Sequence, residues 1–482
     1  MRDAAAPVVA APEADHAPGL ERAFSFVPEE RLAEPLPVAG EIPAFLRGTY
    51  YLNGPARFAR GDLRYRHWLD GDGMVCALRF SGEGAHLTAR FVRSAKLAAE
   101  EAAGQALYRA FGTAFPGDRL VRGIALESPV NVSVYPWGGT LLAFGEQGTP
   151  WELDPDTLET RGLYNFGGAL NPLSPFSAHP KIDPATGELC NFGISFSAAQ
   201  PNLNLYRFTA DGSLVSRKRI ALEEPRSLHD FCFAGRHVAF YLAPYRLDMA
   251  ALAQEGKTLM ESLRWEPEKG SRLLVVRRED AEPVASIPVG NRYVLHGINA
   301  YEEDDRLIAD VLELDRPVYD QYDVPNLFPD VARGRPVRLV VDLAAGTLVD
   351  RHEIAYDKAP DFPAIDPCLA GLPYEHFWML GISKTGLPGR KFFDEVVHCS
   401  WSRPDRAETW QAPPGCYLGG EPAFAPDPSG EGGAVVCQQL DVETGEMTFL
   451  VFDAFDVARG PVAKLALSSP LHLGFHAFFQ PA

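Results

Sequence analysis

The stretch Leu473-Gly474-Phe475-His476-Ala477-Phe478-Phe479, close to the end of the chain, sets one imidazole among apolar and aromatic residues. Chain ends usually fray unless packing holds them, and a polar ring in this setting indicates that the C-terminus is held. Three histidines upstream have a comparable setting: His179 in Phe-Ser-Ala-His-Pro-Lys, His229 in Ser-Leu-His-Asp-Phe, and His296 in Tyr-Val-Leu-His-Gly-Ile. We therefore ask whether the four meet at one metal.

The spacing of these four histidines predicts a particular architecture. They are separated by 50 (229 − 179), 67 (296 − 229) and 180 (476 − 296) positions, so they cannot share a helix or a tight loop. A β-propeller can bring them together, because the inner strands of different blades converge on one axis. Four imidazoles without a cysteine suit a first-row metal such as Fe(II) and leave octahedral positions open.

Each histidine taken alone also fits an ordinary buried structural residue. The remaining histidines lack the apolar setting and are interpreted as structural or surface residues; they are His16, His67, His86, His237, His352, His376, His398 and His472.

The rest of the chain has the pattern of an all-β protein. Short strand-like runs are separated by acidic turns at 154–159, 183–188, 342–347 and 441–446, and the 43 Gly and 41 Pro are spread throughout. Recurring hairpins with similar turns favour a propeller built of small meanders. The period is too irregular to count the blades.

Two insertions interrupt this pattern. Residues 94–111 are expected to be helical, beginning at Ser94 and ending at Gly112, within a cap insertion of about 94–115. Residues 246–265 are expected to form an amphipathic helix. This second insertion is either a helix that caps the propeller or an apolar lip that touches a membrane surface.

Composition bounds the class of protein. A net charge of −19 and a pI near 5.1 exclude a nucleic-acid partner, which needs a basic surface. No apolar stretch approaches the length of about 18 residues that a spanning helix needs.

Residues 1–20 are expected to be a disordered tail, with residues 21–482 forming a single propeller domain. No obligate protein partner is evident.

The cysteines indicate a reducing compartment. Seven are present, an odd number, and no two have C-x-x-C spacing. We expect free buried thiols in a cytoplasmic protein, not disulfides or a zinc site.

The sequence Asp70-Gly71-Asp72-Gly73 suggests calcium at first sight but lacks the continuation of an EF-hand loop. No nucleotide-binding fingerprint is evident.

Three acidic residues lie in apolar sequence, where an unpaired charge is unfavourable: Glu146, Asp361 and Glu421. A ligating histidine normally donates its second N–H to a carboxylate or carbonyl. These three are therefore candidates for orienting the histidines, although composition alone equally allows them to be turn residues.

The chain resembles the carotenoid cleavage oxygenase family, also called retinal-pigment-epithelium-protein-like oxygenases. The matching motifs run in the family's order from about residue 36 to the end; they lie at 48–55, 67–74, 177–184, 228–231, 296–303, 420–422 and 474–476. As a set they are specific, and they cover nearly the whole chain.

This resemblance implies a seven-bladed propeller with Fe(II) on its axis and a cap of helices and loops over the substrate entrance. The family's four iron ligands match His179, His229, His296 and His476, and its three supporting glutamates match Glu146, Asp361 and Glu421. Asp361 departs from the usual glutamate, and the shorter arm is expected either to reach its histidine through water or to shift the iron. A second departure is Val130-Asn131 where the family often has Thr-Asn.

The activity implied is cleavage of a conjugated C=C bond by O2 to give aldehyde or ketone products. No catalytic residue is expected beyond the iron ligands. Leu295, Phe231 and Val130 are predicted to line the substrate pocket. Family members that cleave stilbenes carry Lys immediately before the first supporting glutamate, where this chain has Gly145. The resemblance therefore favours a carotenoid or apocarotenoid polyene.

Three alternatives stay open at this point. The protein could cleave a stilbene or phenylpropanoid, it could bind or isomerise an apolar ligand without oxidation, or it could be a metal-free structural propeller.

Overall fold

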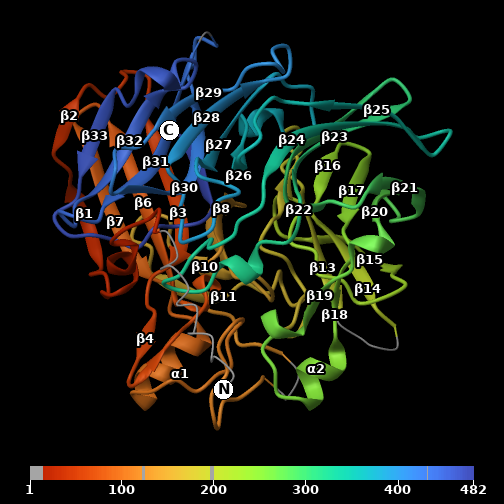
Figure 1. Cartoon of the computed structure of the whole chain (residues 1–482), viewed down its shortest axis with the longest axis horizontal. Helices are drawn as coiled ribbons and strands as arrows, with labels where there is room; N and C mark the ends of the chain where they lie inside the picture. Colours follow the sequence, from red (N-terminus) through yellow and green to blue (C-terminus); the bar gives the residue numbers. More distant parts are fainter. Residues whose placement is uncertain (1–14, 122–124, 196–199, 431) are drawn as a thin grey trace, which may run out of the picture.

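Seven antiparallel sheets surround one axis, so the fold is a seven-bladed β-propeller and the expected all-β class is confirmed (Figure 1). The computed structural model describes residues 15–121, 125–195, 200–430 and 432–482. Each sheet is a small antiparallel meander that runs outward from one strand at the axis.

Blades 1 to 4 are described first, each from the innermost strand outward. Blade 1 contains β34 (Ala477–Pro481), β3 (Gly48–Pro55), β6 (Gly73–Ser81), β7 (Gly84–Phe91) and β1 (Arg31–Pro35). Blade 2 contains β8 (Ser133–Trp137), β9 (Thr140–Phe144), β10 (Trp151–Leu153) and β11 (Thr160–Leu163). Blade 3 contains β12 (Lys181–Ile182), β13 (Leu189–Ser195), β14 (Asn202–Phe208) and β15 (Leu214–Ala221). Blade 4 contains β16 (Cys232–Ala234), β17 (His237–Leu242), β20 (Ser271–Arg277) and β21 (Pro283–Gly290).

Blades 5 to 7 follow in the same order. Blade 5 contains β22 (Tyr293–Glu303), β23 (Arg306–Leu314), β24 (Gly334–Asp342) and β25 (Thr347–Glu353). Blade 6 contains β26 (Ala359–Ala364), β27 (His376–Ile382), β28 (Glu395–Ser400) and β29 (Glu408–Gln411). Blade 7 contains β30 (Cys416–Pro426), β31 (Gly433–Asp441), β32 (Met447–Asp453), β33 (Ala463–Ala466) and β2 (Val38–Gly40).

The ring is closed twice by strands from opposite ends of the chain. In blade 1 the last strand, β34, pairs with β3, and Phe478 lies opposite Tyr51. In blade 7 the early strand β2 pairs with β33, and Ala39 lies opposite Lys464. The C-terminus is therefore held by main-chain hydrogen bonds, as the apolar run around His476 predicts, and neither blade is complete without the other end of the chain.

The remaining elements form a cap at one end of the propeller, in the lower part of Figure 1. It contains two short hairpins and two α-helices: β4 (Ala59–Arg60) with β5 (Leu63–Arg64), β18 (Tyr245–Leu247) with β19 (Leu263–Trp265), α1 (Ala95–Ala103) and α2 (Met249–Gln254). Short 3-10 helices occur in the connections of the chain, at Leu20–Phe24, Trp68–Asp70, Met260–Ser262, Pro267–Lys269, Tyr319–Gln321, Pro367–Leu369 and Val457–Arg459.

The first predicted helix is shorter than expected. Ser94 caps α1, because its side chain accepts the N–H of Leu97, and the helix ends at Ala103 because Gly104 adopts a left-handed conformation. Residues beyond it form a loop in which Glu100 accepts the N–H groups of Leu107 and Tyr108. The expected helix over 94–111 is thus wrong in its second half, where side-chain capping replaced helical hydrogen bonds.

The second insertion is mainly not helical, which corrects the prediction for 246–265. Asp248 caps a helix of only six residues, α2, and the two ends of the insertion pair as the β18–β19 hairpin. Leu247, Leu259 and Leu263 are buried, so the apolar side chains that suggested an amphipathic helix face the protein interior.

A buried cluster of charged residues fixes the cap to blade 1. Lys96 on α1 lies within 2.8 Å of Asp72 and 3.1 Å of Glu100, and Arg60 also pairs with both acids. All four side chains are at most 6% exposed. Because Asp72 is already paired with two cations, the Asp-Gly-Asp-Gly turn serves to anchor the cap.

The N-terminal boundary also differs from the expected tail of residues 1–20. Residues 1–14 lie outside the described part of the chain. From Asp15 onward the chain is packed: Asp15 accepts a hydrogen bond from Arg390 at 2.7 Å, and Ala17 and Leu20 are fully buried. Residues 15–20 are therefore packed against the propeller and are not part of a disordered tail.

The cysteines are all free, and six of the seven are buried, Cys368 being exposed.

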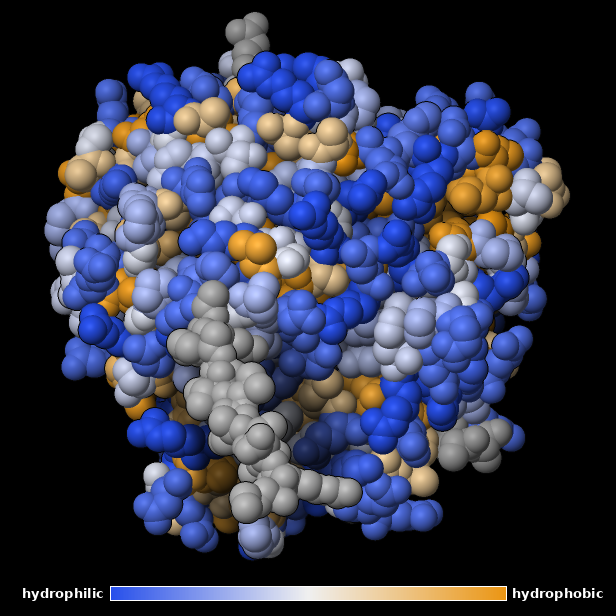
Figure 2. Space-filling view, in the orientation of Figure 1, coloured by the Kyte–Doolittle hydropathy of each residue, from blue (hydrophilic) through white to orange (hydrophobic). Residues whose placement is uncertain are grey.

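The face seen in Figure 2 is mainly hydrophilic, with hydrophobic residues in small groups. Among the described residues, no helix has the length and hydrophobicity needed to cross a membrane.

Candidate metal centre

The four histidines meet on the propeller axis. His296 lies in β22, while His179, His229 and His476 lie just before β12, β16 and β34, the innermost strands of their blades. One ring nitrogen from each lies within 4.8 Å of those of the other three, and all four side chains are buried. The convergence predicted from the spacing of the histidines is therefore present.

The arrangement of the rings fits a metal ion. The Nε2 atoms of His179 and His229 are 2.8 Å apart, and the rings of His179, His296 and His476 have centroids 4.5 to 5.2 Å apart at steep angles. Nε2 of His296 is buried and has no hydrogen-bond partner among the described residues. A buried polar atom without a partner is unfavourable, and a metal ion on the axis would bind its lone pair.

Two of the rings are held neutral by their surroundings. Burial, reinforced by the neighbouring histidines, lowers the pKa of His179 and of His296 well below the usual value. Neutral imidazole is the form that binds a metal. Burial also acts against protonation of His229, but the Glu146 carboxylate opposes it and the pKa of His229 is raised overall.

Carboxylates lie behind three of the four rings, and two of them form hydrogen bonds with the ring. Glu146 accepts a hydrogen bond from Nδ1 of His229 at 2.9 Å, and Asp361 accepts from Nδ1 of His296 at 2.5 Å. Glu421 is 3.4 Å from Nδ1 of His476 and accepts the N–H of Ala477 at 3.1 Å. In His229 and His296 the hydrogen bond at Nδ1 leaves Nε2 available for a metal.

The aspartate reaches its histidine directly, without water, from an irregular part of its strand. The ladder between β26 and β27 shifts register between Asp361 and Ala364, and Phe362 adopts a positive φ of 53°. Such a bulge re-aims a side chain toward a site. Burial raises the pKa of Asp361 to about 6.

Tyr319 is a site residue that sequence reasoning did not identify. Its hydroxyl donates to Glu146 at 3.1 Å and lies 3.1 Å from Nδ1 of His229. Its carbonyl in turn accepts from Nε2 of His67 at 2.9 Å. Tyr319 lies 90 positions from His229 in a connection between strands, and no local motif marks it.

The predicted pocket residues lie in different places. Phe231 borders a chamber of about 480 Å³ that His179, His296 and His476 also line. Leu295 is buried in the core next to His296, and Val130 packs between blades 1 and 2 against residues such as Val75 and Val134. Two residues further on, the carbonyl of Val132 accepts the N–H of His476. A role for Leu295 or Val130 in the pocket wall stays a prediction.

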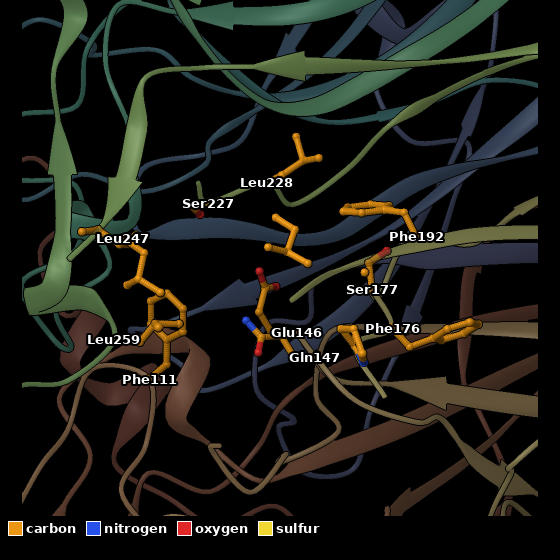
Figure 3. A pocket seen from close by; sticks show the side chains of 14 residues that line it. Phe111, Glu146, Gln147, Phe176, Ser177, Phe192, Ser227, Leu228, Leu247 and Leu259 are labelled. Carbon is orange, nitrogen blue, oxygen red and sulfur yellow. The ribbon is translucent and has the colours of Figure 1, made fainter. Parts of the chain in front are cut away.

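A second cavity lies on the cap side of the site. Figure 3 shows Glu146 and Gln147 in its middle, with Phe111, Leu247 and Leu259 on one side and Phe176 and Phe192 on the other. Its volume is about 30 Å³, whereas a ligand pocket typically has a volume of about 300 to 1,000 Å³.

The position before Glu146 is closed to larger side chains. A Cβ atom added to Gly145 would lie 2.0 Å from Oγ of Ser128. The hydroxyl of Ser128 accepts the N–H of Val130 at 3.2 Å and occupies this space.

Comparisons with known proteins agree with this geometry. A family model described as retinal pigment epithelial membrane protein matches residues 24–481. The apocarotenoid-15,15'-oxygenase of Synechocystis sp. is 30% identical over 454 residues, covering 90% of this chain and 91% of that protein. Isoeugenol monooxygenase of Pseudomonas nitroreducens is 28% identical over 463 residues, covering 92% and 94%. The crystal structure of the cobalt-substituted Synechocystis oxygenase superimposes with a TM-score of 0.87 at 27% identity, covering 96% of this chain and 98% of that one.

Proposed function

Since the chain belongs to the carotenoid cleavage oxygenase family, we propose that it is a non-haem Fe(II) dioxygenase that cleaves a conjugated C=C bond of an apocarotenoid with O2. The four converging buried histidines carry this proposal, together with the unpartnered Nε2 of His296. Both oxygen atoms of O2 enter the two carbonyl products as the C=C and O–O bonds break, so no further reductant is required.

The donor set supports iron as the metal. Four imidazoles without a thiolate suit first-row divalent metals, and four ligands leave octahedral positions free. When bound there, Fe(II) would supply the centre at which O2 and the electron-rich alkene react. No side chain is required as an acid or base, so we propose no catalytic residue beyond the metal ligands.

The protein's own residues would hold the ligands and shape the passage. Glu146 and Asp361 fix the tautomer and ring orientation of His229 and His296. The apolar cap residues Phe111, Leu247 and Leu259 would exclude water from the cap side of the centre. The chamber of about 480 Å³ that three of the histidines line has room for an apolar molecule.

Two observations support an apocarotenoid over a stilbene. The relative that is 30% identical is named for apocarotenoid cleavage. The lysine that marks stilbene-cleaving members has no counterpart at Gly145, and Ser128 fills the space that its side chain would need.

The alternative substrate is a phenylpropanoid or stilbene. It is favoured by the isoeugenol monooxygenase, which aligns with 92% of this chain. A non-oxidative isomerase or a metal-free propeller has less support, because the relatives named above are oxygenases and the histidine geometry suits a metal.

Location and membrane contact stay predictions. The free thiols are the basis for expecting the cytoplasm. A peripheral membrane contact through residues 246–265 would have to use other atoms than Leu247, Leu259 and Leu263, which are buried.

The test uses protein loaded with Fe(II) without air and then given O2 with an apocarotenal or, in parallel, a hydroxystilbene. Wild-type protein is expected to bind iron stoichiometrically and to release an aldehyde, and His296→Ala to lose both. His352→Ala, an exposed histidine outside the site, should retain both. Wild-type protein that binds no iron would overturn the proposal, and iron without product from either substrate would point to the non-oxidative alternative.

A further inference from the structure

The ligand-bearing segments of the metal centre belong to different sheets. His179 and His229 lie just before β12 and β16, the innermost strands of blades 3 and 4, and His296 lies in β22 of blade 5. In the part of the chain that the structure describes, these blades are separate hydrogen-bonded sheets, so their strand ladders do not set the distances between the histidines. Contacts between blades must therefore hold the ring nitrogens at the spacing that a metal needs.

Asp230 makes one such contact between blades 4 and 5. It follows His229 directly, and its Oδ2 accepts the N–H of Gly297 at 2.9 Å. Gly297 in turn follows His296, so this hydrogen bond joins the backbone next to two of the ligands. The other oxygen, Oδ1, accepts the N–H of Phe231 at 2.7 Å, which fixes the carboxylate relative to its own backbone.

Lys181 extends this contact to blade 3. It begins β12, two residues after His179, and its Nζ lies 2.7 Å from Oδ1 of Asp230. The side chain of Asp230 is only 4% exposed, and a buried carboxylate is unfavourable unless its charge is paired. One ion pair and one hydrogen bond therefore link the segments that carry His179, His229 and His296.

The space around this carboxylate is closely filled. A Cβ atom added to Gly297 would lie 2.8 Å from Sγ of Cys232 and 3.6 Å from Oδ2 of Asp230, so glycine allows the close approach of the backbone. Lys181 and Asp230 both border the chamber of about 480 Å³ that three of the histidines line. The pair therefore lies at the centre itself and not in the outer part of the blades.

A second ligand has a comparable contact. Glu421 in blade 7 accepts the N–H of Ala477, the residue after His476, at 3.1 Å. At His296 and at His476, a carboxylate from a neighbouring blade thus binds the peptide N–H that follows the ligand. Holding this peptide limits the movement of the backbone that carries the ligand.

From this geometry we propose that Asp230, held by Lys181, is a positioning residue of the metal centre. It acts on the backbone that carries the histidines, whereas Glu146 and Asp361 act on the rings. Its loss is expected to change the coordination geometry of a bound metal, because the segments from blades 3, 4 and 5 would no longer be linked through it. This inference rests on the proposed metal centre and adds to it a residue that sets its geometry.

The test uses the full-length protein with Asp230→Asn, which keeps the size of the side chain and removes the charge that pairs with Lys181. Co(II), another first-row divalent ion, suits the same four imidazoles, and its visible absorption depends on coordination geometry. Chelator competition measures the affinity for Fe(II) and for Co(II). We expect Asp230→Asn to lose about tenfold or more in affinity for both metals, as is typical of groups that support metal ligands, and to change the Co(II) spectrum.

Arg278→Met is the matched control. Nη1 of Arg278 lies 3.0 Å from Oδ2 of Asp183, and this pair also joins blades 3 and 4, with side chains that are 19% and 13% exposed. Neither residue is adjacent in sequence to a ligand histidine. The control removes an ion pair between the same two blades and should leave the Co(II) spectrum and both affinities unchanged. A merely structural role would affect both variants alike.

A double-mutant cycle shows whether Lys181 acts through Asp230. Lys181→Met leaves a buried charge unpaired, whereas Lys181→Met combined with Asp230→Asn leaves a neutral pair. The double variant should have the same spectrum and affinities as Asp230→Asn alone, because the two residues act as one unit. Additive losses would contradict the part assigned to Lys181. The double variant also provides the spectrum if a single variant does not fold.

The Co(II) spectrum separates this inference from the proposed function. An unchanged spectrum in Asp230→Asn, or an equal change in Arg278→Met, would overturn the inference. Wild-type protein that binds neither metal would instead remove the proposed centre itself. A changed spectrum in Asp230→Asn supports the positioning role even where the Fe(II)-loaded wild type yields no product with O2, in which case only the oxygenase assignment fails.

Discussion

Asp361 lies 2.5 Å from Nδ1 of His296, so an aspartate makes directly the contact for which the family usually has a glutamate. The contact is made from a strand whose ladder shifts register after Asp361 and in which Phe362 has a positive φ. The shorter side chain therefore does not prevent a direct contact with the histidine.

Replacing that carboxylate should weaken metal binding without unfolding the protein. Asp361→Asn keeps the size of the side chain but removes its charge, and loss of such a supporting group typically costs tenfold to a hundredfold in metal affinity. Competition with a chelator, followed by iron analysis, measures it. Asp405→Asn, at an exposed position outside the site, is the control. Equal affinities in the two variants would contradict a supporting role for Asp361.

Tyr319→Phe should loosen the Glu146–His229 pair while the ring still packs. One neutral hydrogen bond contributes about 1 kcal/mol, so we expect a loss of about fivefold in iron affinity. The chelator competition is repeated on this variant beside Tyr356→Phe, whose hydroxyl bonds to Glu395 near blade 6. A similar loss in both would indicate a general effect on stability.

Gly145→Ala should destabilise the protein by about 1 to 3 kcal/mol, the usual effect of overpacking. The added methyl group would lie 2.0 Å from Oγ of Ser128. Combining it with Ser128→Gly should restore part of that loss, because the two positions compete for one space. Urea unfolding of the single and double variants measures the coupling, and strict additivity would show that Ser128 is not the obstacle.

Lys96→Met should be among the most destabilising substitutions in the cap. It leaves Asp72 and Glu100 buried with Arg60 as their only cation in this cluster, and breaking a buried ion pair costs about 3 to 5 kcal/mol. Thermal unfolding is compared with Arg161→Met, whose partners Glu152 and Asp154 lie at the surface. That control should change stability by less than about 1 kcal/mol.

Asp70 should make the folded state less stable as the pH rises from about 4 to about 6. Burial raises its pKa to about 6 from a usual value of 3.8, against hydrogen bonds from Thr113 and Gly112. In this window the folded state binds the proton and the unfolded state has released it. The stabilisation is therefore fully present below pH 4 and is lost as the pH passes 6, a change of about 3 kcal/mol for two pKa units.

The comparison with Asp70→Asn isolates this effect from other titrating groups. Burial lowers the pKa of His67 to about 4, which acts in the opposite direction over the same range. The difference in unfolding free energy between wild type and variant should fall from pH 4 to pH 7. A constant difference would show that Asp70 is ionised throughout.

Much of the site could be predicted from the sequence because its ligands are embedded in unusual local surroundings. His476 lies in an apolar run at a chain end, and the wide spacing of the four histidines required an architecture with converging strands. Glu146 and Asp361 were identified by the same reasoning, as charges in apolar sequence.

Other features depended on contacts between distant segments. The first cap helix ends at the left-handed Gly104, and beyond it the carboxylate of Glu100 accepts the N–H groups of Leu107 and Tyr108 in place of helical hydrogen bonds. The second insertion folded as a hairpin because its two ends pair with each other. The hydrophobic periodicity of the sequence reveals neither of these two sets of hydrogen bonds.

The sequence by itself determined the fold class, the four histidines and their supporting carboxylates, because composition, motif order and apolar setting are local properties. The tertiary structure alone decided that Asp361 contacts His296 directly and that Tyr319 joins Glu146 and His229. These relationships join residues from different blades and the cap, and such residues meet only once the ring of blades has closed.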